Sequence, residues 1–95
     1  MPAPFYAANY THVAAGQTAE QIAGGASIVV NGIIVSGEAD AVVTLLTSAG
    51  ATIGILRVPI DTSFEVKTSF LAASGLAITT DANATCTVFH SNASA

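Results

Sequence analysis

The chain has 95 residues, of which 52% are hydrophobic and only 8% are charged, against roughly 25% charged residues in an average soluble domain. This composition excludes intrinsic disorder, which requires low hydrophobicity and high charge, and the length suits one domain rather than two. Two basic and six acidic residues give a net charge of −4, so the chain lacks the cationic surface that binds nucleic acids or anionic membranes.

The predicted strands follow one another at short intervals, because runs rich in Val, Ile and Thr alternate with turn-forming Gly, Ser, Asn and Asp. In chain order they are residues 10–15, 18–23, 27–36, 40–47, 52–58, 62–70, 76–80 and 84–90. Asn31-Gly32, inside the third strand, predicts either a bulge or a tight turn. The clearest period of two lies in residues 62–70, where one face carries Phe64, Val66, Thr68 and Phe70.

Eight short strands about ten residues apart predict an all-β fold, a small antiparallel β-sandwich of the jelly-roll kind. The sandwich is expected over residues 10–90, followed by a flexible tail at 91–95. Residues 1–9 form an N-terminal arm that holds two of the three prolines and has no obvious place in the sandwich. We expect this arm to lie on a partner. The predicted partner-binding residues are Pro2, Pro4, Phe5, Tyr6 and Tyr10.

Apolar runs are too short for a membrane-spanning helix, which needs about 18 consecutive apolar residues. The longest, residues 28–35 and 53–60, are interrupted by Asn31 and Arg57. The first residues lack the basic start and apolar run of a secretion signal, and the single Cys86 cannot form an internal disulfide. We therefore expect synthesis in a reducing cytoplasm and no membrane partner.

Residues suited to catalysis or metal binding are few. His12 and His90 lie in separate predicted strands, so a zinc site or a small hydrolase requires both to meet a carboxylate in the fold. Cys86 alternates with Ala84 and Val88 and is expected to be a buried apolar residue rather than a nucleophile. The acidic residues lack the Asp-Xaa-Asp spacing of a calcium loop. We expect no catalytic site, no metal and no cofactor, and hence no enzyme.

With so few charges, the outward faces of the strands have to carry Thr, Ser, Ala and some apolar side chains. In residues 40–47 the outward set is part of Val42, Thr44 and Leu46, or their alternates Val43 and Leu45. Large apolar patches mark interaction sites, and a sandwich of this size is marginally stable alone. A symmetric oligomer or attachment to a larger surface is the expected solution.

A resemblance to a known family lies in the order of several segments along residues 10–90. They are Tyr10-Thr11-His12-Val13, Gly24-Gly25 leading into 27–31, 42–45, 53–58, 64–66, 75–78 and 84–89. This order resembles small structural proteins of tailed bacteriophages, which include capsid decoration, or cement, proteins.

The resemblance implies a protein of the capsid surface that binds the major capsid protein and itself, as a homotrimer. It implies no particular binding residues. The alternative is a receptor- or glycan-binding domain of the phage tail apparatus.

Overall fold

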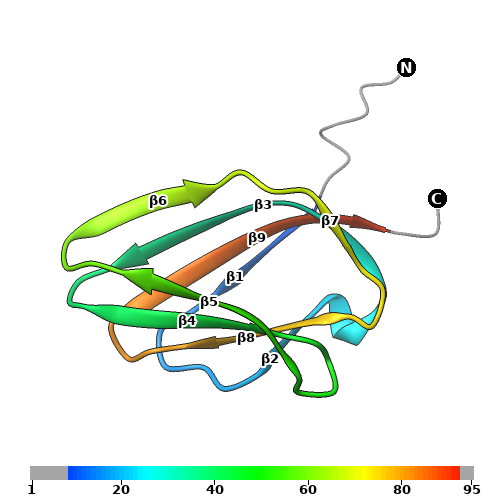
Figure 1. The fold of residues 1–95 in the computed structure, drawn as a ribbon, viewed down its shortest axis with the longest axis horizontal. Coiled ribbons are helices and arrows are strands. Elements are labelled where there is room, and N and C mark those ends of the chain that lie inside the picture. The colour runs from blue at the N-terminus through cyan, green and yellow to red at the C-terminus, as the bar shows by residue number, and fades with distance from the viewer. Residues whose placement is uncertain (1–8, 93–95) are drawn as a thin grey trace.

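The computed structural model describes residues 9–92, and within this range nine strands form two antiparallel sheets (Figure 1). The strands are β1 (Asn9–Val13), β2 (Glu20–Ile22), β3 (Ile28–Gly37), β4 (Ala41–Leu46), β5 (Thr52–Val58), β6 (Thr62–Val66), β7 (Phe70–Ala72), β8 (Leu76–Thr80) and β9 (Ala84–Asn92). A single 3-10 turn, η2 (Ala23–Gly25), lies between β2 and β3. The predicted all-β sandwich is confirmed.

The strand order is that of a jelly roll. Sheet A has the order β1-β9-β3-β6, with β7 also paired to β3, and sheet B has the order β2-β8-β4-β5. With β7 set aside, the first strand pairs with the last, the second with the next to last, and so on inward to β4 and β5. Such pairing is an antiparallel ribbon folded into two facing sheets, which is the jelly-roll arrangement.

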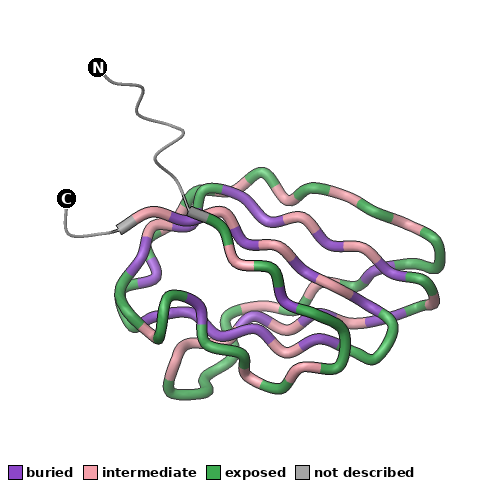
Figure 2. The backbone as a smooth tube through the Cα atoms, turned by 180° about the vertical axis from the view of Figure 1, so that it is seen from behind, coloured by how far each residue is buried: buried purple, intermediate pink, exposed green. Residues whose placement is uncertain are grey.

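The core lies between the sheets and is formed by buried residues that alternate with more exposed ones along the strands, including the edge strands, as the colouring of the backbone in Figure 2 shows. On β4, for example, Ala41, Val43 and Leu45 point inward and are buried. Cys86 on β9 is buried as predicted, and desolvation raises the pKa of its thiol to about 12. A thiol in this state is a small apolar core residue and not a nucleophile.

The region predicted as one strand over residues 62–70 forms two strands. β6 ends at Val66, where the Thr68 N–H donates to the Val66 carbonyl at 3.1 Å and turns the chain, and β7 then pairs with the start of β3. The break lies at the level of Asn31, where the register of β3 against β9 shifts by one residue. Asn31-Gly32 is therefore a bulge and not a turn. A bulge bends its strand, so the strand on the other side of β3 breaks to follow it.

The first and last strands differ slightly from their predicted bounds, and β1 ends at Val13, two residues earlier than predicted. β1 begins at Asn9, and β9 continues through Asn92, which pairs with Ile28, so the strand includes the first two residues of the predicted tail. Residues 1–8 and 93–95 lie outside the described residues. Among the described residues, no helix has the length and hydrophobicity needed to cross a membrane.

One end of the sandwich is packed so tightly that only glycine fits at residue 75. Gly75 has a φ of +82°, and a Cβ there would collide with the Ser48 hydroxyl and the Gly25 backbone. These residues belong to three different connections, 23–27, 47–51 and 73–75, and Ser48 hydrogen-bonds to the Ser74 carbonyl and to the Gly25 carbonyl. We call it the terminal end, because β1 begins there and β9 finishes there (Figure 1).

Candidate interaction surfaces

The outer face of sheet B is almost uncharged. The alternation along β4 places Val42, Thr44 and Leu46 on the outside, which decides between the two predicted sets. The register then sets Ile55 of β5 beside Thr44. We define the outer B face as the outward, solvent-accessible residues of the four strands: Gln21, Val42, Thr44, Leu46, Ile53, Ile55, Arg57 and Thr79. Soluble monomers keep such partly apolar surfaces small, so this face is a candidate interaction site.

The charges gather at the end opposite the terminal end. The connections there are residues 14–19, 38–40, 59–61 and 81–83, and they carry four of the six acidic residues: Glu38, Asp40, Asp61 and Asp81. We call this the acidic end. The connections of the terminal end, in contrast, consist of Ala, Gly, Ser and Thr alone. The molecule is therefore electrostatically polarised along its strands.

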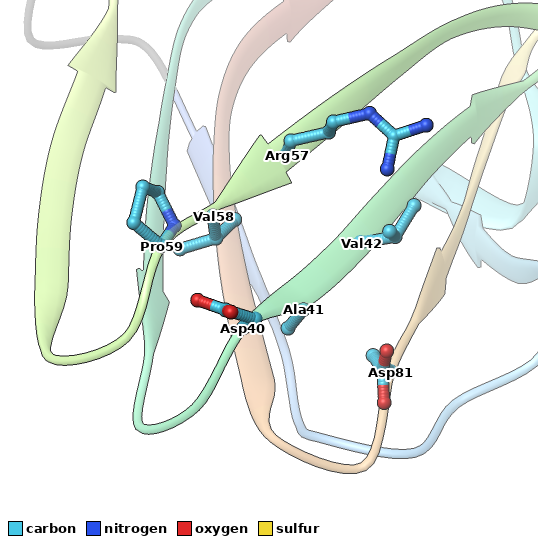
Figure 3. A pocket seen from close by; sticks show the side chains of 7 residues that line it. All are labelled: Asp40, Ala41, Val42, Arg57, Val58, Pro59 and Asp81. Carbon is cyan, nitrogen blue, oxygen red and sulfur yellow. The ribbon is translucent and has the colours of Figure 1, made fainter.

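A shallow hollow of about 460 Å³ lies where the outer B face meets the acidic end (Figure 3). Asp40, Arg57 and Asp81 provide its charged groups. The Arg57 side chain runs along the sheet toward Val42 and away from Asp40, and Asp81 stands on the far rim. The Asp40 carboxylate accepts the backbone N–H of Ile60 at 3.0 Å, which is a turn-stabilising role. No histidine, serine or cysteine lines the hollow, so it does not hold a serine or cysteine nucleophile paired with a histidine base.

The two histidines lie on opposite faces of sheet A. His12 is exposed, with Nδ1 2.9 Å from the Thr87 hydroxyl, whereas His90 is buried, with Nε2 2.9 Å from the Thr11 hydroxyl. Desolvation by burial lowers the pKa of His90. Because the sheet separates the imidazoles, they cannot share a metal ion. Across the described residues, no three His, Cys, Asp or Glu side chains are grouped to hold one.

An exposed aromatic pair lies on the outer face of sheet A. Tyr10 is 70% exposed, and its ring centroid is 6.3 Å from that of Phe89 on the neighbouring strand, with the rings tilted at 46°. Tyr10 is the one predicted partner-binding residue within the described range. Pro2, Pro4, Phe5 and Tyr6 lie outside it.

The side of the sandwich formed by β5, β6 and β7 leaves its core side chains partly uncovered. Leu56, Phe64, Val66 and Phe70 pack against the core but remain half-buried. We call it the open side. Neither this side nor the exposed Ile53 and Ile55 were identified from the sequence. The period of two in residues 52–58 could have indicated that the two isoleucines point outward. The open side has no such local signal, because it depends on which strands lie at the edges of the sheets.

Comparison of the chain with protein-family models, with curated proteins and with solved structures finds no match. No related protein therefore supplies a function or a set of site residues. A fold alone does not determine function, so the surfaces described above have to support it.

Proposed function

We propose that the chain is a non-enzymatic structural protein of a tailed-bacteriophage virion that decorates and stabilises the capsid. In this proposal it is made in the host cytoplasm and binds the major capsid protein on the outside of the head. The observation that carries the proposal is the outer B face, an almost uncharged sheet surface on a small jelly roll. The low total charge and the resemblance of the strand order to cement proteins support the same function.

Binding would be driven by burial of the aliphatic side chains of the outer B face against a capsid subunit. Each Å² of apolar surface removed from water contributes about 25 cal/mol. That surface is supplied by Val42, Leu46, Ile53 and Ile55. Of these, Ile55 is the most exposed, at 56%. Self-association into a homotrimer, which the resemblance implies, would multiply weak single contacts by effective concentration. The arm residues before Tyr10 are expected to add a second contact.

The test uses two matched threonines. Thr44 and Thr85 are both half-buried, point outward and lie on inner strands, but they belong to opposite faces of the sandwich. Thr44→Lys places a charge in the middle of the outer B face, and we expect at least a tenfold loss of cosedimentation with expanded capsids. Thr85→Lys should bind as the wild type does.

Two results would contradict the proposal. One is absence of the protein from purified virions of the phage whose genome encodes it. The other is an equal loss of capsid binding in both lysine variants, because the outer B face would then have no special role. Circular dichroism of each variant confirms that it is folded before binding is compared.

A second candidate function is the receptor- or glycan-binding domain of a tail, and the Tyr10–Phe89 pair favours it. Ligand sites combine aromatic surface with a few polar groups, and His12 and Asn31 lie on the same outer face of sheet A. This function predicts immunogold label at the tail rather than the head. It also predicts that Tyr10→Ala abolishes binding to a glycan array, while Thr44→Lys leaves it unchanged.

A further inference from the structure

Among the described residues, β5 is the longest single strand at the edge of a sheet. The edge strands are β1 on one side of sheet A, β6 and β7 on its other side, and β2 and β5 in sheet B. β5 has seven residues, whereas the other four edge strands have five, three, five and three. It contains no proline and no inward-pointing charge, which are two of the devices that protect natural edges, and its one bulge, where the pairing with β4 steps from Gly54 to Thr52, lies at the start of the strand. Within residues 9–92 only β4 pairs with β5, so the outer row of N–H and C=O groups of β5 faces no other described strand.

The surroundings of β5 offer a partner both apolar contacts and space. The half-buried Leu56 and Phe64 lie on the open side, where an added strand would cover them. Gly54 also points inward, and a Cβ at this position would meet no atom within 4 Å. The inward side of β5 therefore has an empty space at Gly54 and a large side chain, Leu56, two residues further along.

The charge distribution selects how two copies can meet along this edge. A parallel arrangement would bring together the two acidic ends, each with four carboxylates. An antiparallel arrangement sets each acidic end beside the terminal end of the other copy, whose connections carry no charge. The antiparallel pairing therefore avoids repulsion between chains that each have a net charge of −4.

We propose that two copies of this chain pair antiparallel along β5, about a two-fold axis at Ile55. Gly54 then lies opposite Leu56 of the second copy, which fills the gap beside the glycine. Ile53 lies opposite Arg57 of the second copy. The two Arg57 residues, one from each copy, are then four positions apart, about 14 Å along the strand. This distance exceeds the screening length in physiological salt, so the two guanidinium groups repel each other little.

The pairing joins the two B sheets into one sheet of eight strands. Because the two-fold axis is perpendicular to that sheet, both outer B faces point the same way. A homotrimer would need a further, separate contact, and the two contacts together would link neighbouring trimers. The β5 pair does not depend on the proposed capsid function, since it forms in the purified protein.

The first test compares two exposed isoleucines. Ile55 is 56% exposed at the centre of β5, and Ile60 is 58% exposed in the turn that follows it. Ile55→Lys sets two lysines against each other at the two-fold axis, and we expect the mass in sedimentation equilibrium to fall at least by half. Ile60→Lys should retain the wild-type mass. A wild-type monomer, or an assembly that Ile55→Lys leaves intact, would overturn the pairing.

A second variant separates pairing from folding. Gly54→Val has space for its side chain within one copy, and valine favours strands more than glycine does. It should therefore melt at or above the wild-type temperature when monomeric, yet clash with Leu56 of the second copy and weaken pairing at least tenfold. Pairing of Gly54→Val with wild-type affinity would refute the proposed register.

Discussion

The two sides of the sandwich are closed in different ways. Beside β1 and β2, residues 14–19 cross from one sheet to the other and hydrogen-bond to β8, and Val13 and Ile22 are completely buried. On the open side, β5 and β6 are joined only by the turn at one end, and Phe64 is half-buried although it points inward. The difference shows that apolar side chains do not close a sandwich by themselves. In this molecule the completely buried side is the one whose connection hydrogen-bonds to the end of β8.

The sharpest test of this difference removes one aliphatic side chain from each side. Ile22→Ala should reduce the free energy of unfolding by about 3 kcal/mol, because it empties a fully enclosed site. Leu56→Ala should cost about 1 kcal/mol, since that side chain is already partly in water. Both are made in the Ile55→Lys background so that pairing does not contribute, and both are measured by urea unfolding. Equal costs would mean that the open side is closed in solution.

The second test removes the link that closes the β1/β2 side. The buried Thr80 hydroxyl donates to the Ala14 carbonyl at 2.7 Å and accepts the Gln17 N–H at 2.9 Å. Thr80→Val leaves both backbone groups without this partner and should cost about 2 kcal/mol. Thr44→Val, on the outside of the neighbouring strand, should change stability by less than about 0.5 kcal/mol. Similar values for the two variants in thermal melts would show that the crossing segment is not held through Thr80.

The smallest expected effect is a pH dependence at His90. Its pKa is lowered by burial in the folded state, so below about pH 6.5 the unfolded chain binds more protons than the folded one. The stability associated with the neutral imidazole is present above that pH and is lost as the pH falls through the lowered folded-state pKa. The Tm should therefore decrease between pH 7.5 and 5, and His90→Gln should flatten this part of the profile. An unchanged slope in the variant would assign the dependence to other groups.

Local sequence patterns predicted the bounds of those strands that are flanked by turn-forming residues at both ends. The bounds of β5 and β8 agree with the predictions, since Gly50, Pro59, Gly75 and Asp81 mark their limits. The burial of Cys86 also followed from alternation alone. These features depend on residues a few positions apart, which is the range over which periodicity carries information.

Features set by contacts distant in the chain could not be predicted in this way. The break between β6 and β7 follows the bulge in β3, more than thirty residues earlier in the sequence. Alternation in residues 40–47 gives two equivalent faces, and only the packing of Ala41, Val43 and Leu45 into the core decides that Val42 is on the outside. The open side likewise exists because β5 and β6 become edges, which is a property of the complete strand order.

The glycine at residue 75 determines where this scaffold can accept foreign sequence. Because its Cα lies against Ser48 and Gly25, a peptide inserted into any of these three connections would push the other two apart. The turn at residues 59–61 is exposed at the opposite end and touches none of them. An epitope displayed on this protein, or a fluorescent label fused within it, therefore belongs in that turn.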